Sequence, residues 1–343
     1  MHGMVTVIVV NWKRADLLGR SLGSLARQTI PAEIIVVDNE SSGDTRPLEQ
    51  LFPDVRWIHN QRNEGFCRAN NQGINAAHGE FIALLNNDAE AEPAWLEALL
   101  GCFRREDIGM VASKILLHDD PRIIDKAGHL IYPDGQNRGR GTGQRDCGQF
   151  DSEEETLWPD GCAAMYRKSM LDQIGGFDED LFAYGDDAEL GLRARIAGWN
   201  CVYSPRAVVR HRGGMTLGRS SWRRIALIER NRVLLAARHF PLSLLWRNLY
   251  YYALRIAGGI RAAARDEGEV ALHHGIRGKA LLAWGLLAGD LSAVWSLPWT
   301  FYKRVRRSIC GAGSRKLTAR GIHNLILQNS ISVHEISTQA AVR

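Results

Sequence analysis

The sequence predicts an α/β fold in which a parallel sheet is flanked by helices on both faces. Two observations support this prediction. In the first hundred residues, short apolar runs alternate with longer segments that carry apolar residues at helical spacing. The apolar runs are continuous, which is typical of strands buried on both faces. Regular alternation of strand and helix is in turn typical of a parallel sheet covered by helices.

The first four elements follow from these signals in order. Residues 5–10 are an unbroken β-branched run and predict a buried strand. Residues 15–28 place four leucines on one helical face and predict a helix. Residues 33–37 are a second apolar run, which ends at Asp38, and residues 55–59 predict a third, short strand.

The next elements continue the alternation. Residues 66–77 predict a second amphipathic helix, and residues 81–85 predict another buried strand. Pro93 stands where proline best opens a helix, and residues 94–103 are expected to form that helix.

The later part of the chain is less regular. Residues 119–151 are rich in Gly, Arg and Asp and predict an irregular segment, either a substrate lid or a plain surface excursion. A helix is expected at 187–197, and two short strands at 201–203 and 207–211. Beyond residue 219 the sequence predicts basic, aromatic helices.

Charge is unevenly distributed along the chain. Residues 241–343 hold 14 Lys and Arg against 5 Asp and Glu, whereas residues 1–240 hold 29 against 33. We therefore expect an α/β domain over residues 1–240 and a helical, basic, aromatic-rich extension over 241–343. The extension predicts attraction to a phosphate-bearing surface, and its aromatic and leucine side chains suit an anionic membrane better than nucleic acid. Alternatively, these aromatics pack against the first domain or a partner subunit.

Residues 280–302 form the best candidate for a membrane span. Asp290, Pro298 and several Gly and Ser residues interrupt this stretch, so we interpret it as interfacial or packed rather than spanning. The N-terminus lacks the basic-then-apolar layout of a signal peptide, and the six cysteines are scattered without metal-binding spacing. Both features predict a cytoplasmic protein. Peripheral contact with the cytoplasmic face of the inner membrane and formation of a homo-oligomer are left open.

Polar residues follow the predicted strands at their carboxyl ends, which is where ligands bind in parallel sheets. Asp38 is followed by Asn39, Ser41, Ser42 and Asp44. A carboxylate at this edge can accept hydrogen bonds from a base N–H or a ribose hydroxyl. The alternative is a turn whose side chains cap a helix.

Asn86-Asn87-Asp88 follows the strand at 81–85. Buried polar side chains need partners, and a Mg²⁺ ion bound with a diphosphate would be such a partner. Mg²⁺ prefers oxygen ligands and usually takes only one or two carboxylates from a protein. The alternative is an Asx turn that leads to the helix after Pro93. The spacing favours the metal.

Asp186, Asp187 and Glu189 open the helix at 187–197. The helix dipole keeps an aspartate ionised at this position, as a general base requires, although simple helix capping explains the same pattern. Glu189 precedes Arg193 by four residues and is expected to form an ordinary helical ion pair. His211 lies at a strand end before paired glycines, where it could approach a metal or phosphate or be a satisfied polar residue.

Seven stretches resemble, in order and spacing, the GT-A glycosyltransferases of family 2, and specifically their rhamnosyltransferase-type branch. They span Val5 to Gly214 and read VTVIVVNWKRADLLGRSLGSL, IIVVDNESSGD, NEGFCRANNQGI, FIALLNNDAE, WPDGCAAMYRKSML, IGGFDEDLFAYGDDAELGLRARIAGW and VVRHRGG. The resemblance implies a GT-A nucleotide-diphospho-sugar transferase fold, a mixed, mostly parallel sheet flanked by helices. Residues 1–240 would then be the catalytic domain.

The resemblance also implies roles for individual positions. The residues implied to contact the nucleotide-sugar are Val10, Trp12, Asp38, Asn63, Gly65 and Asn86. Those implied to hold the acceptor are Trp158, Asp160 and Gly161. The implied ligands of a divalent cation, Mg²⁺ or Mn²⁺, are Asp88 and His211. Asp187 matches the catalytic base, with Asp186 beside it.

Several positions depart from the family's pattern. Asn86 replaces the first acid of the usual Asp-x-Asp motif, so cation binding would depend more on Asp88, His211 and the diphosphate. Asp186 replaces the usual Glu before the base, which leaves the assignment of the base between Asp186 and Asp187 open. The loop after Asp38 reads Ser-Ser-Gly-Asp where Ser-Ser-Asp-Gly is more usual.

The function implied by the resemblance is inverting transfer of rhamnose or a similar hexose from a dTDP- or UDP-sugar to a glycan or lipid-linked acceptor, in bacterial cell-envelope polysaccharide synthesis. The alternative is a non-catalytic sugar-nucleotide-binding or scaffold protein on the same fold. A dehydrogenase is disfavoured because its glycine-rich turn is absent after the first strand, where Asn11-Trp12-Lys13-Arg14 stands instead.

Overall fold

The computed structural model describes residues 3–40, 43–213, 221–265, 267–268, 275–310 and 316–339. Ser41, Ser42 and Gly214 of the motif stretches therefore lie outside the described residues. The chain forms two compact units. The first unit comprises Met1–Gly128, Gln144–Arg195 and Trp199–Gly213, and the second comprises His129–Gly143, Ile196–Gly198 and Gly214–Arg343.

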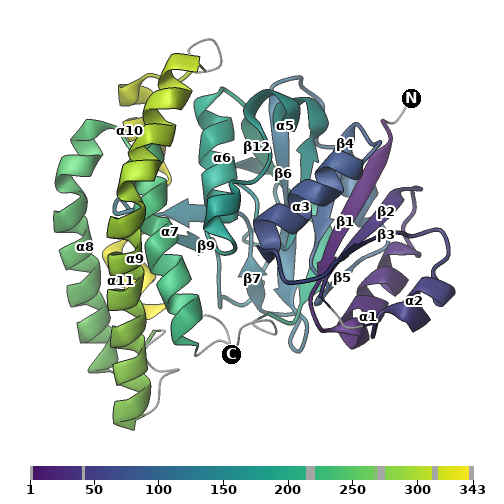
Figure 1. Ribbon diagram of the computed structural model, residues 1–343, viewed down its shortest axis with the longest axis horizontal. Helices are drawn as coiled ribbons and strands as arrows, with labels where there is room; N and C mark the ends of the chain where they lie inside the picture. Colours follow the sequence, from purple (N-terminus) through teal and green to yellow (C-terminus); the bar gives the residue numbers. More distant parts are fainter. Residues whose placement is uncertain are drawn as a thin grey trace. The chain divides into compact units, whose positions relative to one another are not determined.

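The first unit is built on one large sheet with helices packed against it (Figure 1). Its strands are β1 (Val5–Asn11), β2 (Glu33–Asn39), β3 (Arg56–Asn60), β4 (Phe81–Leu85), β5 (Ala89–Ala91), β6 (Ile108–Leu117), β7 (Ile124–Lys126), β10 (Glu154–Thr156), β11 (Ala163–Arg167) and β12 (Asn200–His211). Its helices are α1 (Ala15–Leu25), α2 (Arg46–Leu51), α3 (Gly65–Ala76), α4 (Trp95–Leu100), α5 (Lys168–Ile174), the 3₁₀ helix η1 (Glu179–Leu181) and α6 (Asp186–Ile196).

The strand order is β10-β12-β6-β11-β4-β1-β2-β3, with β5 paired to β12 and β7 paired to β6. Strands β12, β6, β4, β1, β2 and β3 run in one direction, because β11 is antiparallel to both β4 and β6. Strand β10 also runs against them. The predicted fold, a mixed and mostly parallel sheet flanked by helices, is therefore confirmed.

Both faces of the central strands are covered, as their continuous apolar sequences predict. In β1, Val7 and Val9 belong to a core that also contains Leu18 of α1 and Trp95 of α4. Ile8 points to the opposite face, where a Cβ at Gly73 of α3 would lie 2.6 Å from its Cγ2. Helices thus bury alternate residues of the same strand on two sides.

Two regions differ from the sequence-based expectation. The two strands expected near residues 201 and 211 form one long strand, β12, whose pairing with β6 shifts register between Ser204 and Val208. The segment expected to be irregular, 119–151, contains β7 and two further short strands. Pairing of β7 with the preceding strand β6, and of the two further strands with each other, orders this segment.

The second unit is mainly helical, which confirms the predicted helical C-terminal extension. Its elements are β8 (His129–Ile131), β9 (Asn137–Gly139), α7 (Trp222–His239), α8 (Leu242–Ala263), α9 (Gly275–Cys310), α10 (Ala319–Gln328) and α11 (Val333–Thr338). This unit includes α7 and residues 129–143, so its boundaries differ from the expected division after residue 240. The assignment of 1–240 as the catalytic domain stays a prediction.

A buried ion-pair cluster joins the elements of the second unit. Asp134, which is completely buried, accepts a hydrogen bond from Arg255 of α8 at 2.6 Å. Glu229 of α7 accepts bonds from Arg255 at 2.8 Å and from Arg232 at 2.6 Å. Arg232 also lies 3.4 Å from Asp290 of α9. Burial would lower the pKa of Arg255, but Asp134 and Glu229 outweigh this effect and raise it.

We predict that Asp134→Ala destabilises the second unit by about 3–5 kcal/mol, because it removes one of the two carboxylates that neutralise the buried Arg255. Hydrogen exchange at the amides of α7 and α8 measures this loss. The exposed Asp54→Ala is the control and should change the free energy of unfolding by less than about 0.5 kcal/mol. Equal protection in both variants would contradict a stabilising role for the cluster.

Candidate active site

The carboxyl edge of the sheet carries a chain of buried polar side chains. The register of β1 on β2 places Asn11 directly beside Asp38. Asn11 donates a hydrogen bond through Nδ2 to Asp38 Oδ1 at 3.3 Å, and its Oδ1 accepts one from Asn87 Nδ2 at 2.7 Å. Asp38 Oδ2 also accepts a bond from Thr45 at 3.2 Å. The ends of β1 and β2 and the turn after β4 are thereby fixed to one another.

A second group of amides shapes the turn before α3. Asn39 Nδ2 donates to Asn63 Oδ1 at 2.9 Å, and the same Asn63 oxygen accepts from the backbone N–H of Gly65 at 2.9 Å. Gly65 has a φ of +85°, and a Cβ there would lie 2.8 Å from the carbonyl oxygen of Phe182. The site therefore requires glycine at this position, both for backbone conformation and for space.

Asp88 and His211 lie side by side and are both buried. The antiparallel pairing of β5 with β12 sets Ala89 opposite His211, so Asp88 immediately precedes the paired position. His211 Nε2 lies 3.3 Å from Asp88 Oδ1, and His211 Nδ1 lies 2.7 Å from Asp125 Oδ2. Asp125 is on β7, which pairs with the end of β6.

This arrangement has the donor chemistry of a divalent-cation site. Asp125 binds the Nδ1–H of His211 and so directs Nε2 toward the Asp88 carboxylate, as carboxylates that hold a ligating histidine do at metal sites. Burial alone would lower the pKa of His211, but Cys162, Asp88 and Asp125 together raise it well above its ordinary value, so the imidazole holds a proton between the two carboxylates. A divalent cation that binds here displaces this proton, and the Asp88 carboxylate offers the oxygen ligand that Mg²⁺ and Mn²⁺ prefer.

Asp160 and Gly161 reach the same edge from β11. Because β11 is antiparallel to β4, its first residue, Ala163, pairs with Leu85, the last residue of β4. Asp160 Oδ1 accepts a bond from the backbone N–H of Cys162 at 2.8 Å, and its Oδ2 lies 2.7 Å from Lys126 Nζ. Burial would raise the pKa of the neighbouring Asp125, but the positive charge of Lys126 and the contact with His211 outweigh this effect and lower it.

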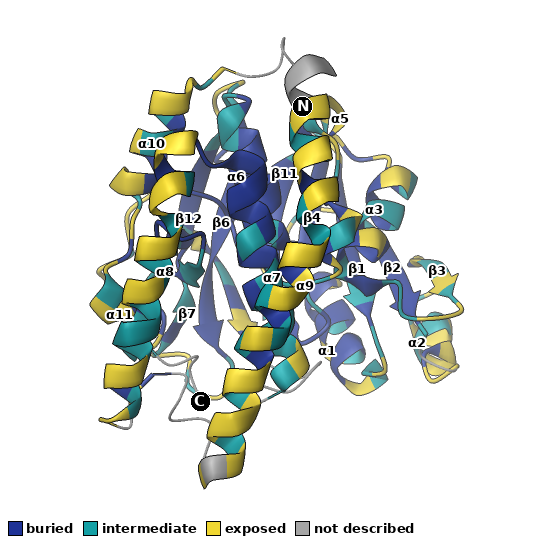
Figure 2. Cartoon of the chain, turned by 60° about the vertical axis from the view of Figure 1, so that its left-hand side comes forward, coloured by how far each residue is buried: buried dark blue, intermediate teal, exposed yellow. Residues whose placement is uncertain are grey.

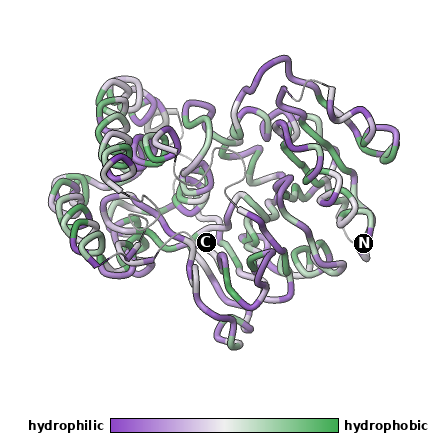
Figure 3. The backbone as a smooth tube through the Cα atoms, turned by 90° about the horizontal axis from the view of Figure 1, so that it is seen from below, coloured by the Kyte–Doolittle hydropathy of each residue, from purple (hydrophilic) through white to green (hydrophobic). Residues whose placement is uncertain are grey.

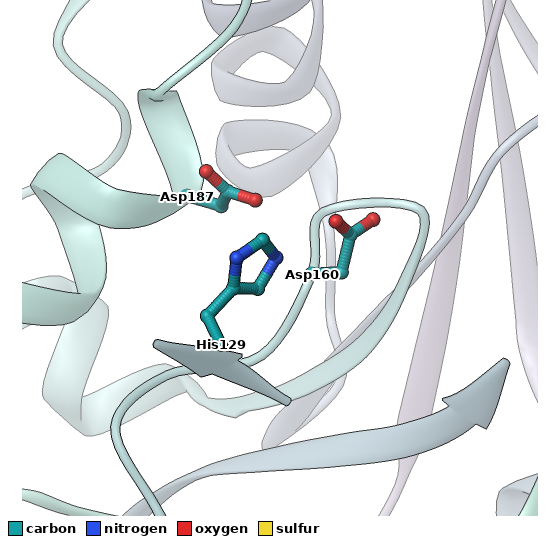
Figure 4. Close-up of side chains that lie close together, drawn as sticks. All are labelled: His129, Asp160 and Asp187. Carbon is teal, nitrogen blue, oxygen red and sulfur yellow. The ribbon is translucent and has the colours of Figure 1, made fainter. Parts of the chain in front are cut away.

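Asp186 and Asp187 begin α6 and face this group. Figure 4 shows the side chains of Asp160 and Asp187, and a carboxylate oxygen of each lies within 4.8 Å of the other. Asp187 is partly exposed and accepts a bond from the backbone N–H of Ala188 at 2.7 Å. Asp186 is buried, and a Cβ at Gly161 would lie 3.7 Å from its Oδ2.

The turn before α6 has an unusual backbone that positions these acids. Phe182, Tyr184 and Gly185 have φ values of 65°, 67° and 72°. Left-handed backbone at two non-glycine residues is uncommon and is found where surrounding structure fixes a functional loop. The predicted pair of Glu189 with Arg193 is confirmed at 2.8 Å, and Arg193 also donates to the carbonyl of Gly176 at 2.7 Å. Glu189 is therefore structural.

The environments of the two aspartates differ. Burial raises the pKa of the Asp186 carboxyl well above its ordinary value, and the neighbouring charges of Asp187 and Asp160 raise it further. Two adjacent carboxylates cannot both ionise easily in a buried site. The buried Asp186 thus retains its proton more readily, while Asp187 has solvent access and the N-terminus of α6 to stabilise a charge.

The other implied site residues are distributed as follows. Val10 and Trp12, at the end of β1, are half-buried, and the buried Nε1 of Trp12 has no hydrogen-bond partner among the described residues. Asn86 is anchored by its backbone, which donates to the carbonyl of Cys162 at 2.8 Å. Trp158 is fully buried against α6, where a Cβ at Gly191 would lie 2.7 Å from its Cγ. The ligand contacts expected of these residues stay predictions.

Sequence reasoning did not identify three polar residues of the site. Asn11 carried a usable signal, because it follows a buried strand in the same way as Asp38 and Asn87. Asp125 and Lys126 carried none, since they lie in a segment without periodicity and reach the site only through the pairing of β7 with β6.

The fold is that of the GT-A glycosyltransferases. It is shared by GalNAc-T7, solved with UDP, GalNAc and Mn²⁺, with a TM-score of 0.60 at 16% identity, over 74% of this chain and 50% of that one. It is also shared by the mannosyltransferase PcManGT of Pyrobaculum calidifontis, solved with GDP-Man and Mn²⁺, with a TM-score of 0.52 at 19% identity, over 86% of this chain and 88% of that one. At these identities the likeness concerns the fold alone.

Comparison of the sequence with family profiles identifies the family of this chain. The family profile described as Glycosyl transferase family 2 matches residues 6–175, and the profile of Glycosyl transferase family group 2 matches residues 145–303. The protein belongs to glycosyl transferase family 2, and the expected family is confirmed.

The chain is also similar to relatives that are named as glycosyltransferases. The chain is 28% identical over 288 residues to the N-acetylglucosaminyl-diphospho-decaprenol L-rhamnosyltransferase of Mycobacterium tuberculosis, which covers 76% of this chain and 92% of that protein. It is 28% identical over 215 residues to the pre-mycofactocin glycosyltransferase of the same species, over 61% of this chain and 43% of that protein. The glycosyltransferase YwdF of Bacillus subtilis is 28% identical over 53% of this chain and 65% of its own length.

We predict that Asp186→Asn stabilises the protein near pH 8, because the variant has no buried carboxyl to ionise. In the wild type, the buried carboxyl binds its proton more tightly when folded, so stability falls as pH rises from the unfolded-state pKa through the raised folded-state pKa. The variant lacks this loss, and its advantage should shrink toward zero below about pH 4. Urea unfolding at several pH values measures the difference. A variant less stable than the wild type near pH 8 would contradict the raised pKa of Asp186.

Proposed function

We propose that the protein is a metal-dependent, inverting glycosyltransferase that transfers a sugar from a nucleoside-diphosphate donor to an acceptor hydroxyl. The observation that carries the proposal is the convergence of three acidic groups at one sheet edge. Asp38 is linked through Asn11 to the turn that bears Asp88, and Asp187 faces the loop that precedes β11. Each group has a distinct environment suited to one part of the reaction.

The donor's nucleoside fits the ends of β1 and β2. Asp38 can accept hydrogen bonds from a base N–H or a ribose hydroxyl, because Asn11 and Thr45 hold its carboxylate in one orientation. The unsatisfied Nε1 of Trp12 offers a donor to the ligand. Asn63 and Gly65 lie on the adjoining turn, where Asn63 is held by Asn39 and Gly65 packs against Phe182, so this turn would border the nucleotide-sugar in one fixed conformation.

Asp88 and His211 would hold Mg²⁺ or Mn²⁺, with the diphosphate completing the coordination. The ion, when bound, neutralises the negative charge that develops on the leaving nucleoside diphosphate. The site needs this positive charge, because Asp88, Asp125, Asp160 and Asp187 outnumber the single lysine among them, Lys126. Asn86, which is uncharged, cannot replace the Asp88 carboxylate.

Asp187 is proposed as the general base. Its carboxylate removes the proton of the acceptor hydroxyl as that oxygen forms a bond to the anomeric carbon. The bond between this carbon and the diphosphate oxygen breaks on the opposite face, so one displacement inverts the configuration and leaves the nucleoside diphosphate free. Asp186 is less suited to this role because burial keeps its proton bound. With Asp186 protonated, Asp187 is the member of the pair that can carry the negative charge.

The donor and acceptor are inferred from the relatives. A relative at 28% identity is named for L-rhamnosyl transfer to a diphospho-decaprenol-linked N-acetylglucosamine. We therefore propose a dTDP- or UDP-linked rhamnose or similar hexose as donor, and a glycan or lipid-linked acceptor of bacterial envelope polysaccharide synthesis. Asp160, held by Lys126, and Gly161 would position the acceptor next to Asp187. The reaction would take place on the cytoplasmic side of the membrane.

We predict that Asp187→Asn lowers the turnover rate by about 10²–10⁴-fold, because it removes the group that accepts the proton. Donor binding should be unchanged, since Asp187 is not placed on the nucleotide side. Release of nucleoside diphosphate in the presence of acceptor and Mn²⁺ measures turnover. Asp172→Asn, an exposed aspartate on α5, is the control. Near-normal turnover by a folded Asp187→Asn protein would exclude Asp187 as the base.

We predict that Asp88→Asn weakens Mn²⁺-dependent binding of the nucleotide by at least about tenfold, because it removes the only carboxylate proposed as a direct ligand. Calorimetric titration with UDP or dTDP, with and without Mn²⁺, measures this effect. Asp54→Asn should bind as the wild type does. If the nucleotide binds Asp88→Asn equally well with Mn²⁺, the proposed cation site is wrong.

A further inference from the structure

Helix α9 packs against α7 through small residues. Gly285, Gly289 and Ala293 are buried at four-residue intervals and so lie on one face of the helix. A Cβ at Gly289 would lie 2.6 Å from the carbonyl oxygen of Ala226, and one at Gly285 would lie 2.9 Å from Ile225. The two helices therefore approach closely along this face.

The opposite face of α9 carries a continuous row of large apolar side chains, here called the outer stripe. Its members lie at helical spacing and are all exposed: Trp284, Leu287, Leu291, Val294, Trp295 and Tyr302. Trp295 is 90% exposed and Leu291 60%. Figure 2 shows exposed residues along this side of α9, and Figure 3 shows hydrophobic and hydrophilic residues alternating along the C-terminal helices. Exposed rows of this size mark interaction surfaces.

Basic residues stand at both ends of the outer stripe. Arg277 and Lys279 precede it, and Lys303 and Arg306 follow it. The single acidic residue of α9, Asp290, does not face outward with the stripe, because it accepts a hydrogen bond from Tyr252 of α8 at 2.7 Å and lies beside Arg232 of α7. An apolar row with Trp and Tyr, bordered only by cations, complements the headgroup layer of an anionic lipid surface.

Residues Arg277–Arg306 form the one helix, among those the structure describes, that is long and apolar enough to cross a membrane. The packing of α9 disfavours a span. Its inner face packs on α7 between Gly285 and Arg304, and α7 carries Glu229, Arg230 and Arg232 at its middle. A crossing α9 would take these charges toward the bilayer centre, which is strongly unfavourable. A helix lying in the membrane plane keeps α7 and Asp290 on the aqueous side.

We propose that the outer stripe of α9 docks in the plane of an anionic lipid surface. This inference does not depend on the proposed transferase reaction, because it rests on the exposed face of one helix. The docking combines burial of the stripe in the headgroup region with attraction of its flanking cations to lipid phosphates.

The test is flotation of the full-length protein with vesicles. We expect the wild type to float with vesicles of equal parts phosphatidylglycerol and phosphatidylcholine, and to remain unbound to phosphatidylcholine alone. Leu291→Asp should lower partitioning by at least about tenfold, because it places a charge in the centre of the stripe. Leu51→Asp is the matched control, since Leu51 is an exposed leucine of the first unit, at 68%, and should not change flotation.

A second pair of variants tests the charge contribution. Lys303→Gln with Arg306→Gln should lower partitioning by about fivefold per neutralised residue and reduce its sensitivity to salt. Arg105→Gln with Arg122→Gln, two exposed arginines of the first unit, removes the same charge elsewhere and should have little effect. Equal losses in the two double variants would show attraction by net charge alone and would overturn docking by the stripe.

Other outcomes would also overturn the proposal. They are absence of flotation by the wild type, or flotation of Leu291→Asp equal to that of Leu51→Asp. A wild-type dimer that Leu291→Asp dissociates, without vesicle binding, would assign the stripe to a second copy of the chain. Resistance of bound protein to extraction at alkaline pH would indicate a span rather than docking. Asp187→Asn should float as the wild type does, so failure of the proposed catalysis and failure of docking are distinguishable.

Discussion

The site depends on the parallel register of β1 on β2, which brings Asn11 and Asp38 to the same level at the carboxyl edge of the sheet. At that level the two side chains are buried and must satisfy each other. Asn11 uses its remaining amide oxygen to bind Asn87, which fixes the turn that carries Asp88. A one-residue slip between the two strands would turn these side chains to opposite faces and separate Asp38 from the turn that carries Asp88.

Much of this arrangement could be predicted from the sequence, because it depends on local signals. Continuous apolar runs identified β1, β2 and β4, and the polar residues after them identified Asp38 and Asp88. The role of β7 could not be predicted, since a three-residue strand has no period of its own and is formed by pairing with β6. For the same reason Asp125, which orients His211, was not found, and β12 was expected as two strands rather than one.

The two aspartates at the start of α6 show a different limit of sequence reasoning. They are chemically identical neighbours, and the sequence left the choice of base open between them. The structure separates them by environment, because Asp186 is turned into the protein toward Gly161 whereas Asp187 reaches solvent at the helix N-terminus. Which member of such a pair can lose a proton is decided by packing, and a motif does not encode packing.

The contact of Gly65 with Phe182 has a consequence for how this site can diverge among related enzymes. Gly65 lies on the predicted donor side, whereas Phe182 belongs to the left-handed turn that leads into α6. The carbonyl of Phe182 also accepts the backbone N–H of Cys67. Evolutionary change in sugar preference that enlarges the side chain at position 65 would displace the turn that carries the acids. The two ends of the site are therefore constrained to co-evolve, and new donor specificities would arise more readily from residues outside this contact.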